Sequence, residues 1–125
     1  MAVQDDHMIR NIQDVGRLIA KLLLHEQQPN YTLPENEADY TEADKLFVTI
    51  MKLAEEGKIN EAENELYVGM VEDDVDYLEL ALTFYLYLND MDGDFLDNNG
   101  YSREEVLDGM KELASDWGAT GLEAF

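Results

Sequence analysis

The sequence predicts an all-α fold, a single-domain bundle of about five helices over residues 1–125. Residues 75–91 are apolar around most of a helical circumference, so several neighbouring segments must cover them. Four other segments repeat their apolar residues at helical spacing and begin with capping signals. The length of 125 residues and the hydrophobic content of 46% are sufficient for one core without disulfide bonds.

The helix predicted over residues 75–91 is expected to be the centre of the fold. On a helical projection, Asp76, Glu79, Thr83 and Asp90 fall within about 60° of one another, and Tyr87 lies beside them. This predicts one narrow exposed edge on an otherwise buried helix, with Asp76 as its N-terminal cap. The tyrosines of this helix are expected to pack between helices rather than to line a ligand pocket: Tyr77, Tyr85 and Tyr87.

The first helix is predicted over residues 7–24, with Asp5 and Asp6 as its caps. Its apolar arc reaches about 200°, wider than one packing partner would cover, so we expect this helix to mediate self-association. A narrow basic strip on the opposite side is expected to meet acids of the same chain or of a second copy. The predicted interface consists of a seam (Met8, Ile12, Val15, Ile19 and Leu22) and the strip (Arg10, Arg17 and Lys21).

Residues 25–40 contain both prolines and no helical period, which predicts a connecting loop. Tyr31, Leu33 and Tyr40 are interpreted as anchors of this loop on the core.

A helical hairpin is predicted from helices over residues 42–56 and 60–71. The first helix begins at a capping box from Thr41 to Asp44, Gly57 and Lys58 break it, and Asn60 is expected to cap the second. A two-residue break makes the helices antiparallel neighbours. The apolar and glycine spacing is similar to one tetratricopeptide repeat.

The last helix is predicted over residues 102–117. Ser102 and Glu105 form its capping box, Trp117 belongs to its inward stripe, and Gly118 ends it. The tail, residues 118–125, has no helical period. Its apolar Leu122 and Phe125 could either dock on the bundle or fray.

Charge is the most unusual feature of the composition. There are 29 acidic residues against eight Lys and Arg, which gives a formal net charge of −21, and residues 59–102 hold twelve acids and no Lys or Arg. Nucleic acid and anionic membranes would be repelled. A surface that favours solubility explains most of this charge; a basic protein partner, cation binding and mimicry of nucleic acid remain the alternatives.

The acidic segment of residues 90–97 begins Asp-x-Asp-x-Asp, which is the start of a calcium loop. An EF-hand also needs Gly at the sixth position and Glu at the twelfth, where this chain has Phe95 and Tyr101. We therefore predict a polar loop rich in turn formers. A cation site at Asp90, Asp92 and Asp94 is the alternative.

Enzymatic activity is not expected. The two histidines, His7 and His25, would lie about 27 Å apart on one helix, so they cannot share a site. There is no cysteine nucleophile, histidine-based metal motif or phosphate-binding glycine loop. We predict no cofactor and no resident metal. With no signal peptide and no transmembrane segment recognised, we predict a cytoplasmic location.

Four motifs together resemble an uncharacterised all-helical family of Gram-positive bacteria, a domain of unknown function. They are Met8–Ile12, Gly57–Leu66, Tyr77–Asn89 and Ser102–Val106, and the resemblance extends from about Asp6 to Gly118. It implies a cytoplasmic helical domain with tetratricopeptide-like packing. It implies no activity, ligand or site residue.

The sequence therefore favours a noncatalytic protein-protein interaction module that forms a homodimer and whose other protein partners are unknown. The alternatives are a cation- or small-ligand-binding regulator that uses residues 90–97, and an acidic mimic of nucleic acid.

Overall fold

The structure is a computed structural model that describes residues 2–119, 121 and 122, with side chains from residue 6 onward. Every regular element in the described part of the chain is a helix, which confirms the predicted all-α class. No helix within these residues is long and apolar enough to cross a bilayer. The elements are α1 (Ala2–Ile19), η1 (Ala20–Leu24, a π-helix), η2 (Glu37–Asp39, a 3-10 helix), α2 (Glu42–Glu55), α3 (Ile59–Gly69), α4 (Val75–Asn89), α5 (Gly93–Asn98) and α6 (Arg103–Asp116).

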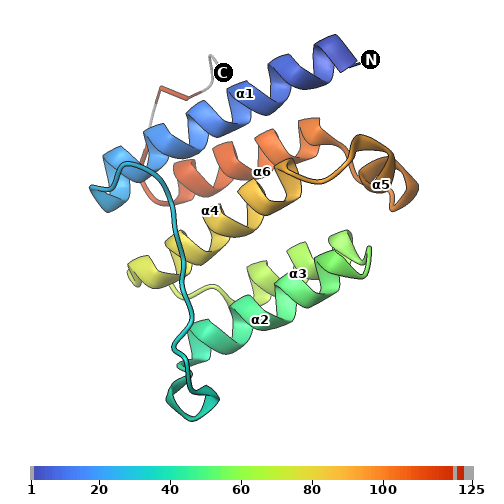
Figure 1. The fold of residues 1–125 in the computed structure, drawn as a ribbon. Coiled ribbons are helices and arrows are strands. Elements are labelled where there is room, and N and C mark those ends of the chain that lie inside the picture. Colours follow the sequence, from blue (N-terminus) through green and yellow to red (C-terminus); the bar gives the residue numbers. More distant parts are fainter. Residues whose placement is uncertain (1, 120, 123–125) are drawn as a thin grey trace.

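Helix α4 lies at the centre of the bundle, as predicted. The hairpin of α2 and α3 lies on one side of it, and α1 and α6 lie on the other (Figure 1). Nine of the fifteen residues of α4 are buried, including Tyr77 and Tyr85, which pack in the core as expected. A helix that is apolar on most sides is stabilised only when several neighbours cover it, and α1, α2 and α6 do so.

Two of the predicted capping boxes are confirmed, and the other start signals are wrong in detail. Thr41 and Ser102 cap α2 and α6 with reciprocal hydrogen bonds to Asp44 and Glu105. Helix α1 already begins at Ala2, so Asp5 and Asp6 lie within it rather than capping it. The other two corrections concern α3 and α4: Asn60 lies inside α3, which has no side-chain cap, and Asp74 rather than Asp76 caps α4.

The predicted acidic loop contains a short helix, α5, that the sequence analysis missed. Asp92 caps it by accepting a 3.0 Å hydrogen bond from the Asp94 amide. Leu96 is only 1% exposed and anchors the helix in the core. Six residues are too few to show a helical period, which explains why turn-forming residues dominated the sequence signal.

The loop of residues 25–40 crosses α4 and covers part of its polar edge (Figure 1). The amides of Asn30 and Tyr31 donate 3.1 Å hydrogen bonds to Glu79 Oε2 and Thr83 Oγ1 of α4. The edge that was predicted to be exposed therefore serves at these two residues to hold the loop. Tyr31 is an anchor, as predicted, whereas Leu33 is exposed and is not.

The start of the tail docks on the bundle. Gly118 has φ +95°, a conformation that favours glycine, and it ends the last helical turn. Leu122 is 5% exposed and belongs to the core. The prediction for Phe125 lies outside the described residues.

Candidate functional site

The seam of the predicted interface on α1 lies inside the chain's own core. Ile12, Val15 and Ile19 are 0% exposed. Helices α4 and α6 both pack on α1, so two partners from the same chain cover its wide apolar arc. A second copy could contact these three residues only if α1 separated from α4 and α6, so this part of the interface prediction requires a different conformation.

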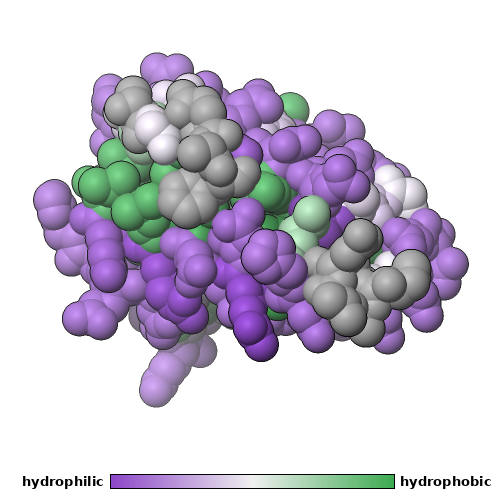
Figure 2. All heavy atoms as spheres, turned by 90° about the horizontal axis from the view of Figure 1, so that it is seen from above, coloured by the Kyte–Doolittle hydropathy of each residue, from purple (hydrophilic) through white to green (hydrophobic). Residues whose placement is uncertain are grey.

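The rest of the predicted interface remains at the surface. Leu22 is 50% exposed and Met8 is half-buried. The basic strip is exposed, but its one ion pair among the described side chains, from Arg17 to Asp14 at 3.0 Å, lies within α1. Figure 2, which looks down on the molecule from above, shows a mostly hydrophilic surface with a hydrophobic area at the left, the side on which α1 and η1 end in Figure 1.

The three aspartates of the alternative cation site do not form a metal-binding group. The described residues contain no cluster of three or more His, Asp or Glu side chains suited to a metal ion. The guanidinium of Arg103 lies at this junction, where its Nη2 donates hydrogen bonds to the carbonyls of Asn89, at 3.0 Å, and Met91. Arg103 thus places a positive charge at the C-terminal end of α4, which satisfies carbonyls that a cation would otherwise bind.

A small cavity of about 380 Å³ adjoins this junction and includes Asp90, Asp92 and Arg103 in its lining. Arg103 Nε and Asn89 Oδ1 are buried there without a hydrogen-bond partner in the described part of the chain. The buried cation makes this cavity a poor site for a second cation.

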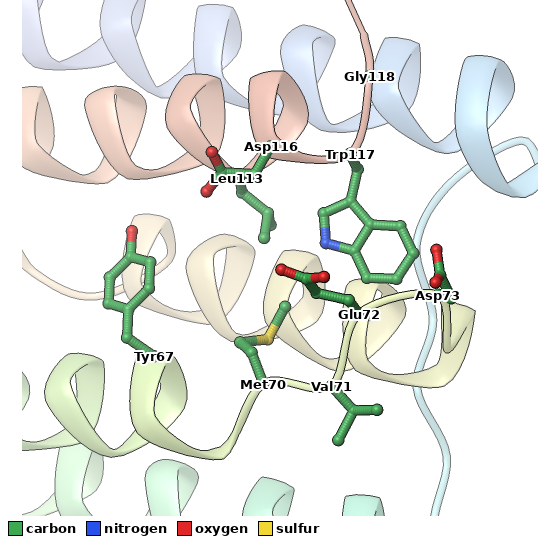
Figure 3. Close-up of a pocket in the computed structure, with 9 residues that line it drawn as sticks. All are labelled: Tyr67, Met70, Val71, Glu72, Asp73, Leu113, Asp116, Trp117 and Gly118. Atoms are coloured by element: carbon green, nitrogen blue, oxygen red, sulfur yellow. The ribbon is translucent and has the colours of Figure 1, made fainter.

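An open groove with a volume of about 680 Å³ lies between α3 and α6 (Figure 3). The C-terminal turn of α3 and the linker to α4 form one wall, and the C-terminal end of α6 forms the other. The lining consists of apolar residues, three acids and one glycine: Tyr67, Met70, Val71, Leu113 and Trp117, with Glu72, Asp73, Asp116 and Gly118.

Local backbone features form the linker wall. Helix α3 ends at Gly69, where an added Cβ would lie 2.9 Å from the methyl groups of Leu46 on α2, so a larger residue here would require the Leu46 side chain to move. Met70 is extended and Asp73 is left-handed, with φ 69°, before Asp74 caps α4. The short linker therefore turns sharply and presents its side chains to the groove.

A tyrosine network supports the groove from below. Glu63 Oε2 accepts hydrogen bonds from the hydroxyls of Tyr85, at 2.6 Å, and Tyr101, at 3.0 Å, and the Tyr67 hydroxyl lies 3.3 Å from that of Tyr85. Burial, reinforced by the Glu63 charge, raises the pKa of Tyr85 and Tyr101, so both hydroxyls stay protonated as donors. The network joins α3 to α4 and to the residue before α6, which sets the position of the groove wall.

The segment that forms the linker wall of this groove is rich in exposed apolar side chains. Of seven large hydrophobic residues exposed in the described part of the chain, four lie within residues 67–75. Tyr67 and Val71, which are 40% and 44% exposed, line the groove, whereas Val68 and Val75 are not part of its lining. A concentration of this kind is the usual mark of an interaction surface.

The charge of the groove is uniformly negative. None of its nine lining residues is Lys, Arg or His. Burial raises the pKa of Tyr67, the hydrogen bond with Tyr85 lowers it, and the charges of Glu63 on α3 and of Glu112 and Asp116 on α6 raise it.

The sequence analysis did not identify this groove. Trp117 was predicted to belong to the inward stripe of the last helix, because it lies on an apolar face of that helix. Two signals in the sequence indicated it in part: the chain has a single Trp, at position 117, and the apolar run from Tyr67 to Val71 is followed directly by acids.

The sequence profile of DUF6483, a family of unknown function, matches residues 2–118. The chain belongs to this family. The match spans α1 to α6 and confirms the resemblance to an uncharacterised domain. No curated protein and no solved structure matches the chain. Membership in DUF6483 assigns no ligand or partner, so any role for the groove must be argued from its geometry.

Proposed function

We propose that this protein is a noncatalytic protein-interaction module that binds its partner in the groove between α3 and α6. The observation that carries the proposal is an open groove lined by five apolar side chains and three acids, in which the apolar Tyr67 and Val71 are exposed. Isolated surface hydrophobic residues are normal in soluble proteins, but a contiguous group beside a groove is typical of a binding surface.

The groove can bind without any rearrangement of the core. Its walls are held by the Glu63 network and by the packing of α2 on α3. A rigid, preformed surface loses little conformational entropy when it binds. The α1 seam, in contrast, becomes available only if α1 leaves α4 and α6, which would expose Ile12, Val15 and Ile19 to water.

A noncatalytic role is supported by the positions of the titratable groups. His7 and His25 are exposed and lie at opposite ends of the α1–η1 segment. Glu79, one of the acids of the central helix, accepts a hydrogen bond from the backbone amide of Asn30. Glu63 accepts two structural hydrogen bonds from tyrosines.

Affinity capture from the native lysate tests the proposal by comparing three baits. The wild type is compared with a groove variant, Tyr67→Ser with Val71→Ser, and with a matched control, Leu33→Ser with Val48→Ser, which changes two exposed apolar residues outside the groove lining. We expect a protein that the wild type and the control retain and the groove variant loses. If all three baits retain the same proteins, the groove is not the docking surface.

Self-association remains a prediction with a narrower basis. Only Leu22, Met8 and the exposed strip could take part without unfolding α1. Light scattering over a concentration series checks it, and a monomer at tens of micromolar rejects the homodimer.

A further inference from the structure

We infer that the groove accepts a cationic amphipathic helix of another protein, with large apolar side chains on one face and Lys or Arg beside them. This inference rests on the proposed function and adds the chemistry of the partner. It combines the shape of the groove, its apolar floor and the acids on its two walls.

The apolar part of the groove is elongated. Figure 3 shows Tyr67 and Trp117 at opposite ends, with Leu113 and Met70 between them. A row of apolar side chains that is open along one side matches the apolar face of a helix, whose contacts recur every three or four residues. Small-molecule pockets of similar volume usually enclose most of the ligand surface, whereas this groove of about 680 Å³ is open along one side.

The acids of the groove come from both of its walls. Glu72 and Asp73 come from the linker wall and Asp116 from the α6 wall. Carboxylates on both sides of an apolar floor complement ammonium or guanidinium groups on both flanks of a helix. The acids of the groove would repel an acidic helix. They therefore attract a basic partner and also discriminate against an acidic one.

A second copy of the chain is a poor occupant. Each copy carries a formal net charge of −21, so two copies repel each other at long range. The only basic strip is that of α1, where Arg17 is already paired with Asp14. A cationic segment of another protein can pair with the acids of the groove without this repulsion.

Trp117 provides a direct measurement, because it is the only tryptophan and it lines the groove. The probes are three synthetic peptides without Trp, about 15 residues or four helical turns long. The first is an amphipathic helix of Leu and Lys, the second replaces every Lys with Gln, and the third has the composition of the first in a scrambled, non-amphipathic order. We expect the first peptide to change the Trp117 emission and to bind about tenfold more tightly than the other two.

Matched charge variants separate the groove from the general negative field. The groove variant is Glu72→Gln, Asp73→Asn and Asp116→Asn; asparagine tolerates the left-handed conformation of residue 73. The control is Asp94→Asn, Asp97→Asn and Glu104→Gln, which removes the same charge from α5 and the first turn of α6. The groove variant should weaken binding of the Leu and Lys peptide about tenfold, and the control by less than about threefold.

Four results would overturn the inference. Equal weakening by both variants would show attraction by net charge alone, and no response of Trp117 to any peptide would show that the groove does not accept a helix. A dimer in light scattering that the groove variant abolishes would make a second copy the occupant. Equal binding of the Gln peptide would refute the cationic partner but leave the proposed docking surface intact, whereas failure of the capture experiment would refute that surface itself.

Discussion

The Tyr85 hydroxyl donates a 2.6 Å hydrogen bond to the Glu63 carboxylate and thereby joins the central helix α4 to α3. Tyr101, directly before α6, donates to the same oxygen at 3.0 Å. Tyr85 is 0% exposed, so its hydroxyl has no access to bulk water and depends on this acceptor. One carboxylate therefore connects three parts of the bundle beneath the groove.

Replacing Tyr85 with Phe should destabilise the fold by about 1.5–3 kcal/mol, since it removes a hydrogen bond to a charged group while keeping the ring. Urea unfolding measures the loss. Tyr87→Phe on the same helix is the control: its hydroxyl has no hydrogen-bond partner among the described residues, and we expect a change below about 0.5 kcal/mol. Equal losses in both variants would contradict a stabilising role for the Glu63 bond.

Gly109→Ala should destabilise α6 although alanine is the better helix former. An added Cβ would lie 2.6 Å from two ring carbons of Tyr85, closer than packed atoms approach, and the expected cost is about 1–3 kcal/mol. Gly16→Ala is the control, because its nearest contacts are flexible ends of Leu86 and Met110 at 3.1 Å. Combining Gly109→Ala with Tyr85→Leu should recover part of the loss, and strictly additive costs would refute the proposed clash.

Tyr31→Phe should lower stability in a way that depends on pH. The Tyr31 hydroxyl donates a 2.5 Å hydrogen bond that lowers the pKa of Asp44, and the Thr41 amide lowers it further against the opposing effect of burial. Because the pKa of Asp44 is lower in the folded state, its carboxylate stabilises the fold at pH values above its ordinary pKa of 3.8. This stabilisation is lost as the pH falls through the pKa of the folded state.

We therefore expect Tyr31→Phe to cost about 1 kcal/mol near pH 7 and progressively less below about pH 4. Urea unfolding at several pH values measures this. Tyr40→Phe serves as the control in the same loop. A loss that is constant from neutral to acid pH would show that the Tyr31 ring contacts matter and the hydrogen bond to Asp44 does not.

Glu26→Gln should stabilise the protein slightly near neutral pH. Burial raises the pKa of Glu79, a hydrogen bond to Glu26 and the charge of Glu26 raise it further, and only the Asn30 amide lowers it. Because the pKa of Glu79 is raised in the folded state, its protonated form stabilises the fold at acid pH. This stabilisation is lost as the pH rises through the pKa of Glu79 in the folded protein. Glutamine at position 26 removes the repulsion between the two carboxylates.

The expected gain is at most about 0.5 kcal/mol near pH 7, because Glu26 is exposed and solvent screens the pair. The gain should disappear below about pH 4, where Glu79 is protonated in both proteins. Thermal unfolding at both pH values checks this, with the exposed Glu35→Gln as the control. A gain that persists at acid pH would show another cause.

Much of the fold could be predicted because its signals are local. The capping boxes at Thr41 and Ser102 bring residues three positions apart into contact, and the apolar circumference of α4 is visible in the sequence. The short helix α5 was missed, because it has fewer than two turns and owes its position to the burial of Leu96.

The candidate site could not be predicted in the same way. A helical projection shows that Tyr67 and Trp117 lie on apolar faces, but it does not show which neighbour covers each face. The same ambiguity affected α1, whose wide apolar arc was interpreted as a dimer seam. Its second partner is α6, which lies more than seventy residues later in the sequence.

The sequence by itself determined the helical class, the central position of α4 and the excess of negative charge, since these depend on residue type and local spacing. Only the tertiary structure decided that α1 is covered within the chain and that α3 and α6 leave an acidic, apolar groove between them. The physical reason is that burial depends on how distant helices pack. No periodicity within one helix determines whether its apolar face meets another helix, a second molecule or water.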